Sequence, residues 1–257
     1  MARVGFIGAG EIASAMIGTI AGDGHAITVS RRNEEVSARL ERAHPGLRRA
    51  DNQEVLDASD VVVLCLLAET ARRELPGLRF RADQAVISVM AGMSLDELSR
   101  ACAPATDICV AIPLPPLPLG GTPLAAYPAS RALAELFGPH ATIHACPSEE
   151  ALNAHFAATG LLLPLLDQID VGATWLAEFT GDRAAAASYL AGLLGGYCRM
   201  LTAPDAPDLA RMRAGLGTEG GLNYTLSKAL ADNGTPAALS DGLDGLRARL
   251  GLPEKTR

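Results

Sequence analysis

The sequence has few aromatic residues and no cysteine spacing of the kind that binds metals. Aromatic side chains make up 4% of the 257 residues, and there is one tryptophan. The five cysteines are Cys65, Cys102, Cys109, Cys146 and Cys198. Because their number is odd and no C-x-x-C pair occurs, neither a zinc site nor a fully paired disulfide framework is indicated. We expect free thiols, mostly buried in apolar segments, and no metal.

The chain also lacks an excess of basic residues and a long apolar run near its start. Acidic residues outnumber basic ones by 29 to 22, for a net charge of −7. A nucleic-acid partner is therefore not expected. The apolar run 61–68 is too short to span a bilayer, and the N-terminus has no charged leader before an apolar core. We expect a soluble, cytoplasmic protein that binds no membrane.

What the chain does contain is a glycine-rich turn between a predicted strand and a predicted helix. Residues 3–7 form a short apolar run, and residues 11–21 carry apolar side chains at helical spacing. Between them, Gly8 permits a tight turn and Gly10 leaves room for a pyrophosphate. Ala13 lets the helix pack closely on the strand, and the helix N-terminus offers N–H donors to an anion. The segment predicts dinucleotide binding.

The end of the second predicted strand indicates which dinucleotide is expected. Residues 26–29 end about twenty residues after the turn, where a carboxylate would bond the ribose hydroxyls of NAD. The sequence has Ser30-Arg31-Arg32 there instead. Guanidinium groups beside a hydroxyl suit a 2′-phosphate dianion, so we predict NADP(H). The alternative, a solvated basic pair at a helix start, is disfavoured because Asn33 already caps that helix and cations are unfavourable there.

Strand and helix patterns alternate up to residue 146, and only helical patterns follow. Further apolar strands are predicted at 61–66, 85–89 and 107–112, with helices between them. We therefore predict an α/β Rossmann domain with a doubly wound, mostly parallel sheet over residues 1–146. An all-α domain is predicted over residues 147–257. Its apolar residues fall on more than one helical face, which favours a homodimer formed through these helices.

With these segments in order, the chain resembles the pyrroline-5-carboxylate reductase family, which reduces a cyclic imine with NAD(P)H to give proline. The likeness covers nearly the whole length and is closest in residues 4–10 and 86–95. It implies a dinucleotide-binding domain, a helical domain that dimerises, and an active site between them. On matching positions it implies that the NADP(H) site is lined by Gly8, Ala9, Gly10, Glu11, Ile12, Ser30, Arg31, Arg32, Asn52, Leu66 and Leu67.

The chain departs from that family where the family handles its substrate. Met-Pro-Asn-Thr-Pro is replaced at residues 112–116 by Ile-Pro-Leu-Pro-Pro, and Ser-Pro-Gly-Gly-Thr-Thr at residues 218–223 by Thr-Glu-Gly-Gly-Leu-Asn. A pocket that loses hydrogen-bond donors and gains Leu114, Leu161 and Leu222 favours a larger or less charged ligand. We expect a cyclic imine or ketimine other than pyrroline-5-carboxylate.

Three residues in segments that match the family's active-site walls are candidates for catalysis: His155, Glu219 and Asn223. Tyr224 lies beside them. Each also has a purely structural interpretation. His155 is then a core or interface histidine, Glu219 a first-turn carboxylate that stabilises a helix, and Asn223 and Tyr224 are residues on a helix face. An iminium substrate already carries its proton, so a dedicated general acid is required only for a carbonyl substrate.

Two other functions stay open at the level of sequence. A dehydrogenase of the 3-hydroxyacid type shares the two-domain plan, but it would require an inward-facing lysine on the first helix of the second domain. No lysine lies between Ser148 and Leu201. A protein that binds NADP without catalysis, as a sensor or interaction module, would also show the loss of substrate donors.

Replacing Arg31 and Arg32 together with Ala is expected to weaken NADPH binding and to leave NADH binding unchanged. Each lost charge-assisted hydrogen bond contributes on the order of 1.5 to 3 kcal/mol. Titration of the variant and the native protein with both cofactors measures the effect. A native protein that prefers NADH would contradict the prediction.

Overall fold

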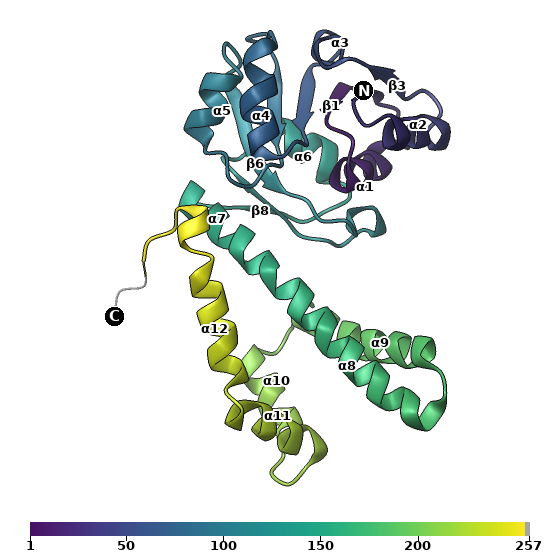
Figure 1. Cartoon of the computed structure of the whole chain (residues 1–257), viewed down its shortest axis with the longest axis vertical. Helices are drawn as coiled ribbons and strands as arrows, with labels where there is room; N and C mark the ends of the chain where they lie inside the picture. The colour runs from purple at the N-terminus through teal and green to yellow at the C-terminus, as the bar shows by residue number, and fades with distance from the viewer. Residues whose placement is uncertain (255–257) are drawn as a thin grey trace. The chain divides into compact units, whose positions relative to one another are not determined.

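The computed structural model describes residues 1–254, which divide into two compact units (Figure 1). The first unit comprises Met1–Phe156 and Ala248–Glu254, and the second comprises Ala157–Arg247. The first unit thus continues past residue 146, where the sequence suggested a boundary. The physical reason is helix α7, Glu149–Ala158, whose Leu152 is buried in a core cluster of the sheet.

The first unit is built on one eight-stranded sheet with the order β3-β2-β1-β4-β5-β6-β7-β8. All neighbouring strands are parallel except β6 and β7, which are antiparallel. The predicted doubly wound, mostly parallel sheet is therefore confirmed. The strands are β1 (Arg3–Ile7), β2 (Ala26–Ser30), β3 (Arg48–Ala50), β4 (Val61–Leu64), β5 (Ala85–Ser88), β6 (Asp107–Ile112), β7 (Leu124–Tyr127) and β8 (Ile143–Ala145).

Helices cover both faces of this sheet. Besides α7, the helices of the unit are α1 (Glu11–Ile20), α2 (Glu34–Ala43), α3 (Asn52–Asp57), α4 (Ala68–Glu74), α5 (Leu95–Ala101) and α6 (Arg131–Phe137), with short 3₁₀ turns at Leu75–Gly77, Leu117–Leu119 and Ala248–Leu250. Successive strand residues point to opposite faces. In β4, Val61 and Val63 pack with residues of α1 and α6, whereas Val62 and Leu64 pack with residues of α3, α4 and α5.

Side-chain caps begin several of these helices. Asn33 accepts a hydrogen bond from the Val36 amide at the start of α2, and Ser94 with Glu97 forms a capping box at the start of α5, both as predicted. A second capping box, between Asp51 and Glu54, opens α3. It brings two carboxylates to the end of β3, next to β2.

The second unit is helical throughout its described residues, as predicted. Its helices are α8 (Leu162–Thr180), α9 (Arg183–Leu201), α10 (Leu209–Leu216), α11 (Leu222–Asp232) and α12 (Thr235–Gly245), preceded by a 3₁₀ turn at Thr159–Leu161. Helices α8 and α9 form a closely packed hairpin, in which Asp170 of α8 is ion-paired with Arg183. A Cβ atom on Gly172 would lie 3.0 Å from Cδ1 of Leu190 in α9.

The second unit leaves many large apolar side chains exposed. On α8, Trp175 and Phe179 pack against each other with ring centroids 5.1 Å apart, yet they are 61% and 72% exposed. The helical stretch Glu149–Thr180 is long and apolar enough to cross a membrane by length and composition alone. It carries carboxylates such as Asp167 and Asp170, and charged side chains are costly in a bilayer. Exposed apolar surface of this extent often marks an interaction site.

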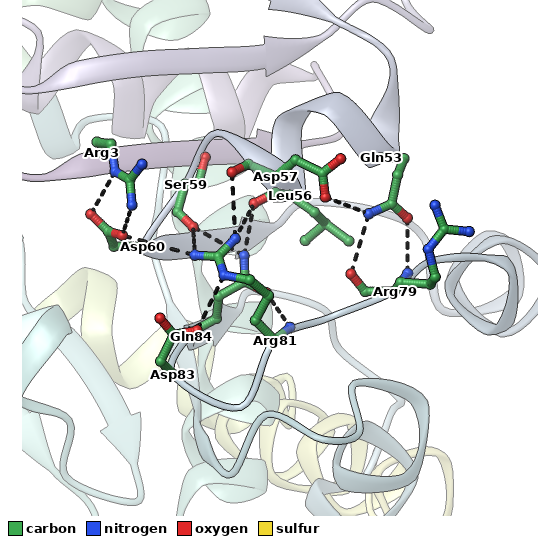
Figure 2. Close-up of polar contacts among 10 residues, drawn as sticks. All are labelled: Arg3, Gln53, Leu56, Asp57, Ser59, Asp60, Arg79, Arg81, Asp83 and Gln84. Carbon is green, nitrogen blue, oxygen red and sulfur yellow. Dashed lines mark hydrogen bonds and ion pairs between the residues drawn. The ribbon is translucent and has the colours of Figure 1, made fainter.

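A polar network fastens the loop before β5 to the end of α3 (Figure 2). The buried amide of Gln84 donates to the carbonyls of Leu56, at 2.8 Å, and Ser59, at 3.0 Å. Its oxygen accepts from the Arg81 amide, and the Arg81 guanidinium donates to the same two carbonyls. The Leu56 carbonyl also accepts from the Ser59 amide, so these side chains add to the bonds that end α3. The network ties the segment between α3 and β4 to the loop before β5.

Replacing Gln84 with Met, which has a similar length, is expected to lower the free energy of unfolding by about 1 to 3 kcal/mol, because buried polar groups lose hydrogen bonds. Chemical denaturation measures the loss. Gln53→Met is the matched control, since Gln53 bonds the Arg79 backbone at a more exposed position. An equal loss of unfolding free energy in both variants would contradict the role assigned to the buried hydrogen bonds of Gln84.

Candidate functional site

Gly8 lies at the point where β1 approaches the end of β4 most closely. Its φ of +103° is in the left-handed region that favours glycine. A Cβ atom there would lie 2.2 Å from the Cys65 carbonyl oxygen and 3.2 Å from Cδ2 of Leu66. The turn and the segment after β4 are therefore in contact, and both contain residues that the resemblance expects to line the cofactor site. Only glycine fits this position.

Gly10 is the N-cap of α1, and the space beside it is open. No atom lies within 4 Å of the place where its Cβ atom would be. No side chain caps this helix, and the first helical hydrogen bond runs from the Ser14 amide to the Gly10 carbonyl, at 2.9 Å. The amides of Glu11, Ile12 and Ala13 thus have no partner within the helix. Open space above unbonded amides at a helix N-terminus fits a pyrophosphate.

Ser30 has a different part in the site from the one expected. Its side chain is buried, and its Oγ accepts a hydrogen bond of 2.8 Å from the Gly8 amide. The sequence suggested a hydroxyl facing a 2′-phosphate. In the structure this hydroxyl ties the end of β2 to the turn after β1, so we assign it to positioning the turn.

Arg31 and Arg32 are half-exposed at the end of β2, and both are ion-paired. The Arg31 guanidinium lies 3.2 Å from the Glu54 carboxylate and 3.7 Å from the Asp51 carboxylate. Arg32 lies 3.3 Å from the carboxylate of Glu74, the last residue of α4. The sequence predicted that these arginines bind a 2′-phosphate, and it did not indicate their carboxylate partners. The partners come from other segments of the chain, so no local pattern pairs them with the arginines. The one signal in the sequence is the Asp51–Glu54 spacing, which is that of a capping box.

The other residues expected to contact the cofactor are also at this edge of the sheet. Asn52 is the first residue of α3, and Ala9 is buried within the turn. Leu67, the N-cap residue of α4, follows β4 after Cys65 and Leu66 and is 80% exposed. Glu11 is exposed in the first turn of α1, so a carboxylate lies beside the open amides. The open amides of the turn and the two arginines thus lie at the same edge of the sheet.

The three candidates for catalysis fall in different units. His155 is exposed on α7 of the first unit, and its Nδ1 atom donates to the Ala151 carbonyl at 2.8 Å. Cys146 Sγ lies 3.7 Å from the same nitrogen. Glu219 is exposed in the loop before α11, and Asn223 is the second residue of that helix. Their catalytic roles stay predictions.

Asn223 lines a cavity of about 640 Å³ between α10 and α11 of the second unit. Tyr224, Ser227 and Arg213 contribute further polar groups to its wall, and Leu216 contributes an apolar one. Glu219 and His155 are not among its lining residues. The cavity therefore combines a cation with neutral donors, a combination that the sequence did not suggest.

The cysteines belong to the structure rather than to this site. All five are free thiols, and Cys102 and Cys109 are buried. Burial raises the pKa of the Cys102 thiol to about 12 and that of the Cys109 thiol to about 11. Both thiols are therefore protonated at neutral pH. Within residues 1–254, no group of three or more His, Cys, Asp or Glu side chains is placed to hold a metal ion.

Comparison with known proteins gives one family model and one curated relative, each matching part of the chain. Residues 3–92 match the family model described as NADP oxidoreductase, coenzyme F420-dependent. Pyrroline-5-carboxylate reductase 2 of Bacillus subtilis (strain 168) is 30% identical over 106 residues. Those residues are 39% of this chain and 38% of that relative, so the match spans about two fifths of the relative's length.

Among solved structures, the whole chain is similar to pyrroline-5-carboxylate reductases. The structure from Streptococcus pyogenes gives a TM-score of 0.82 at 20% identity, covering 98% of this chain and 99% of that one. The structure from Plasmodium falciparum, with NADP bound, gives 0.80 at 15% identity, covering 95% of each chain. These matches confirm the fold, and together with the N-terminal match they confirm the resemblance predicted from the sequence.

An imine reductase from Aspergillus terreus has a more distant likeness. Its structure, in complex with NADPH4 and a dibenzazepine, gives a TM-score of 0.57 at 16% identity. The match covers 98% of this chain and 88% of that one. In fold and in its N-terminal segment, the chain is thus similar to NAD(P)-dependent oxidoreductases of the pyrroline-5-carboxylate reductase kind.

Alanine substitutions at Gly8 and Gly10 distinguish the contribution of the turn to stability from its contribution to NADPH binding. Gly8→Ala is expected to destabilise the protein, because the new methyl group meets backbone atoms and φ is positive. Gly10→Ala is expected to leave the melting temperature unchanged and to weaken NADPH binding by about tenfold or more, equivalent to about 1.4 kcal/mol. Thermal denaturation and fluorescence titration measure the two effects. Unchanged NADPH affinity in Gly10→Ala would contradict the assignment of the turn.

Proposed function

We propose that the protein is an NADP(H)-dependent reductase, a divergent member of the pyrroline-5-carboxylate reductase family that acts on a C=N substrate. The observation that carries the proposal is the edge of the sheet at which the Gly8–Gly10 turn, Arg31 and Arg32 lie together. Open amides at the start of α1 suit the pyrophosphate. The two guanidinium groups at the end of β2 suit a 2′-phosphate. The Plasmodium falciparum structure that holds NADP has the same fold.

When bound, the nicotinamide supplies the hydride, and the chain supplies position and charge. The turn after β1 holds the pyrophosphate through backbone amides, and Ser30 holds that turn. Arg31 and Arg32 fix the adenosine end. An iminium acceptor already carries the proton that the product amine needs, so the chain requires no buried acid for it. The exposed positions of His155 and Glu219 are compatible with such a substrate.

The substrate is proposed to be larger or less charged than pyrroline-5-carboxylate. Leu222 stands where the family has a hydroxyl at the start of α11, and its side chain is 92% exposed within this chain. Leu114 and Leu161 replace polar residues in the same way. Apolar walls favour apolar ligands, because unpaired polar groups are costly to bury. The imine reductase with a similar fold was solved with a dibenzazepine.

A homodimer through the second unit accounts best for its exposed apolar side chains. Trp175 and Phe179 of α8 and Tyr189 of α9 are each more than 60% exposed. Apolar surface of this kind is usually covered by a partner. Since Asp170 and Arg183 lie on the same hairpin, a protein partner suits it better than the interior of a bilayer. We accordingly propose a soluble cytoplasmic dimer.

A second candidate function is NADP binding without catalysis, as a sensor or interaction module. The specific observation in its favour is that apolar residues replace polar side chains of the family's substrate segments, as Leu114 and Pro115 do in residues 112–116 and Leu222 does in residues 218–223. The cofactor edge alone does not separate the two functions.

Oxidation of NADPH by the purified protein separates the candidates. The acceptors are pyrroline-5-carboxylate, apolar cyclic imines, acyclic ketimines and keto acids, each also tried with NADH. We expect the fastest turnover with an apolar cyclic imine and NADPH, because the substrate segments carry leucines and the cofactor edge carries arginines. Loss of NADPH absorbance measures the rate.

The other outcomes of this NADPH-oxidation assay each favour a different function or substrate class. Tight NADPH binding without oxidation by any acceptor would favour the non-catalytic function. Oxidation by keto acids alone would favour a 3-hydroxyacid-type dehydrogenase. A preference for pyrroline-5-carboxylate over the apolar imines would overturn the proposed substrate class and retain the family assignment.

A further inference from the structure

The Glu54 carboxylate is a fixed neighbour of Arg31. Its Oε2 atom accepts hydrogen bonds from Nη2 of Arg31, at 3.2 Å, and from the Asp51 amide, at 3.0 Å. The second bond belongs to the capping box of α3, in which the Asp51 side chain accepts from the Glu54 amide at 2.9 Å. Helix formation therefore holds this carboxylate beside the guanidinium.

We propose that Glu54 determines how strongly the site prefers NADPH to NADH, because it competes with the 2′-phosphate for Arg31. The inference rests on the proposed function, in which the cofactor is NADP(H). A phosphate dianion that approaches Arg31 meets a guanidinium whose charge is already partly balanced. The capping hydrogen bond keeps Glu54 nearby after the phosphate arrives, so like charges stay close together. NADH carries no 2′-phosphate and is insensitive to this competition.

Arg32 is in a different position. Its partner Glu74 lies 3.3 Å away and is shared with Arg73, whose Nε atom lies 3.3 Å from the same oxygen. One carboxylate thus balances two guanidinium groups there, which leaves net positive charge for a phosphate. At Arg31 two carboxylates, those of Glu54 and Asp51, face one guanidinium. Glu54 is therefore the residue whose charge opposes the 2′-phosphate most directly.

The test is the substitution Glu54→Gln. Glutamine also serves at this position of a capping box, so helix α3 keeps its cap while the negative charge is removed. Both partners are more than half exposed, so solvent screens the pair. We expect NADPH to bind about twofold to fivefold more tightly to the variant. The dissociation constant of NADH is expected to stay unchanged, and calorimetric or fluorescence titration of the two cofactors measures both values.

Glu97→Gln is the matched control. Glu97 occupies the same position in the capping box of α5, accepts from the Ser94 amide at 3.0 Å and pairs with Arg72 at 3.1 Å. It is not among the residues expected to contact the cofactor. This variant is expected to leave both dissociation constants unchanged, and its melting temperature reports what loss of such a pair costs the fold.

A double-mutant cycle with Arg31→Ala tests whether the effect passes through Arg31. Once Arg31 is removed, Glu54→Gln should change NADPH affinity much less than it does in the native background. An unchanged NADPH-to-NADH ratio in Glu54→Gln, or an equal gain with and without Arg31, would overturn the inference and leave the proposed function intact. A native protein that does not prefer NADPH would overturn the cofactor assignment and this inference together.

Discussion

The close approach of the first turn to the neighbouring strand is the constraint on which the candidate site depends. Gly8 leaves no room for a Cβ atom against the Cys65 backbone, so the chain leaves β1 at one angle only. That angle directs the N-terminus of α1 and its unbonded amides to the carboxyl edge of the sheet. Ser30 accepts from the Gly8 amide and so couples this turn to the strand that ends in Arg31. The glycine turn and the strand that precedes the two arginines are thus linked through one buried hydrogen bond.

Electrostatic balance is the second organising feature of this edge. A doubly wound sheet brings the ends of β2 and β3 together, and the capping box that starts α3 places its carboxylates beside the arginines of β2. The same side chain, Glu54, therefore both caps a helix and pairs with an arginine of the proposed cofactor site. The arrangement stabilises a short helix, and it also balances cations that a phosphate would otherwise meet unpaired.

The fold was largely predictable from local patterns. Long apolar runs such as 61–64 and 107–112 predicted central strands, and Asn33 and Ser94 predicted helix starts that the structure confirms. The short strands β3, β7 and β8 were not predicted. Segments of three or four residues, such as Arg48–Ala50, carry too few side chains for a period to show, and they are strands only because a neighbouring strand supplies hydrogen bonds.

For the site, the sequence by itself determined the identity of the groups proposed to bind the phosphates: glycines between a strand and a helix, and arginines at the end of the second strand. These groups can be recognised in the sequence because the turn and its helix are contiguous in the chain. Only the tertiary structure decided what surrounds them. The burial of Ser30 depends on packing against Gly8, and the pairing of Arg31 with Glu54 depends on two strands lying side by side. Side-chain partners drawn from distant segments have no periodicity or spacing in the sequence, so only the folded chain reveals them.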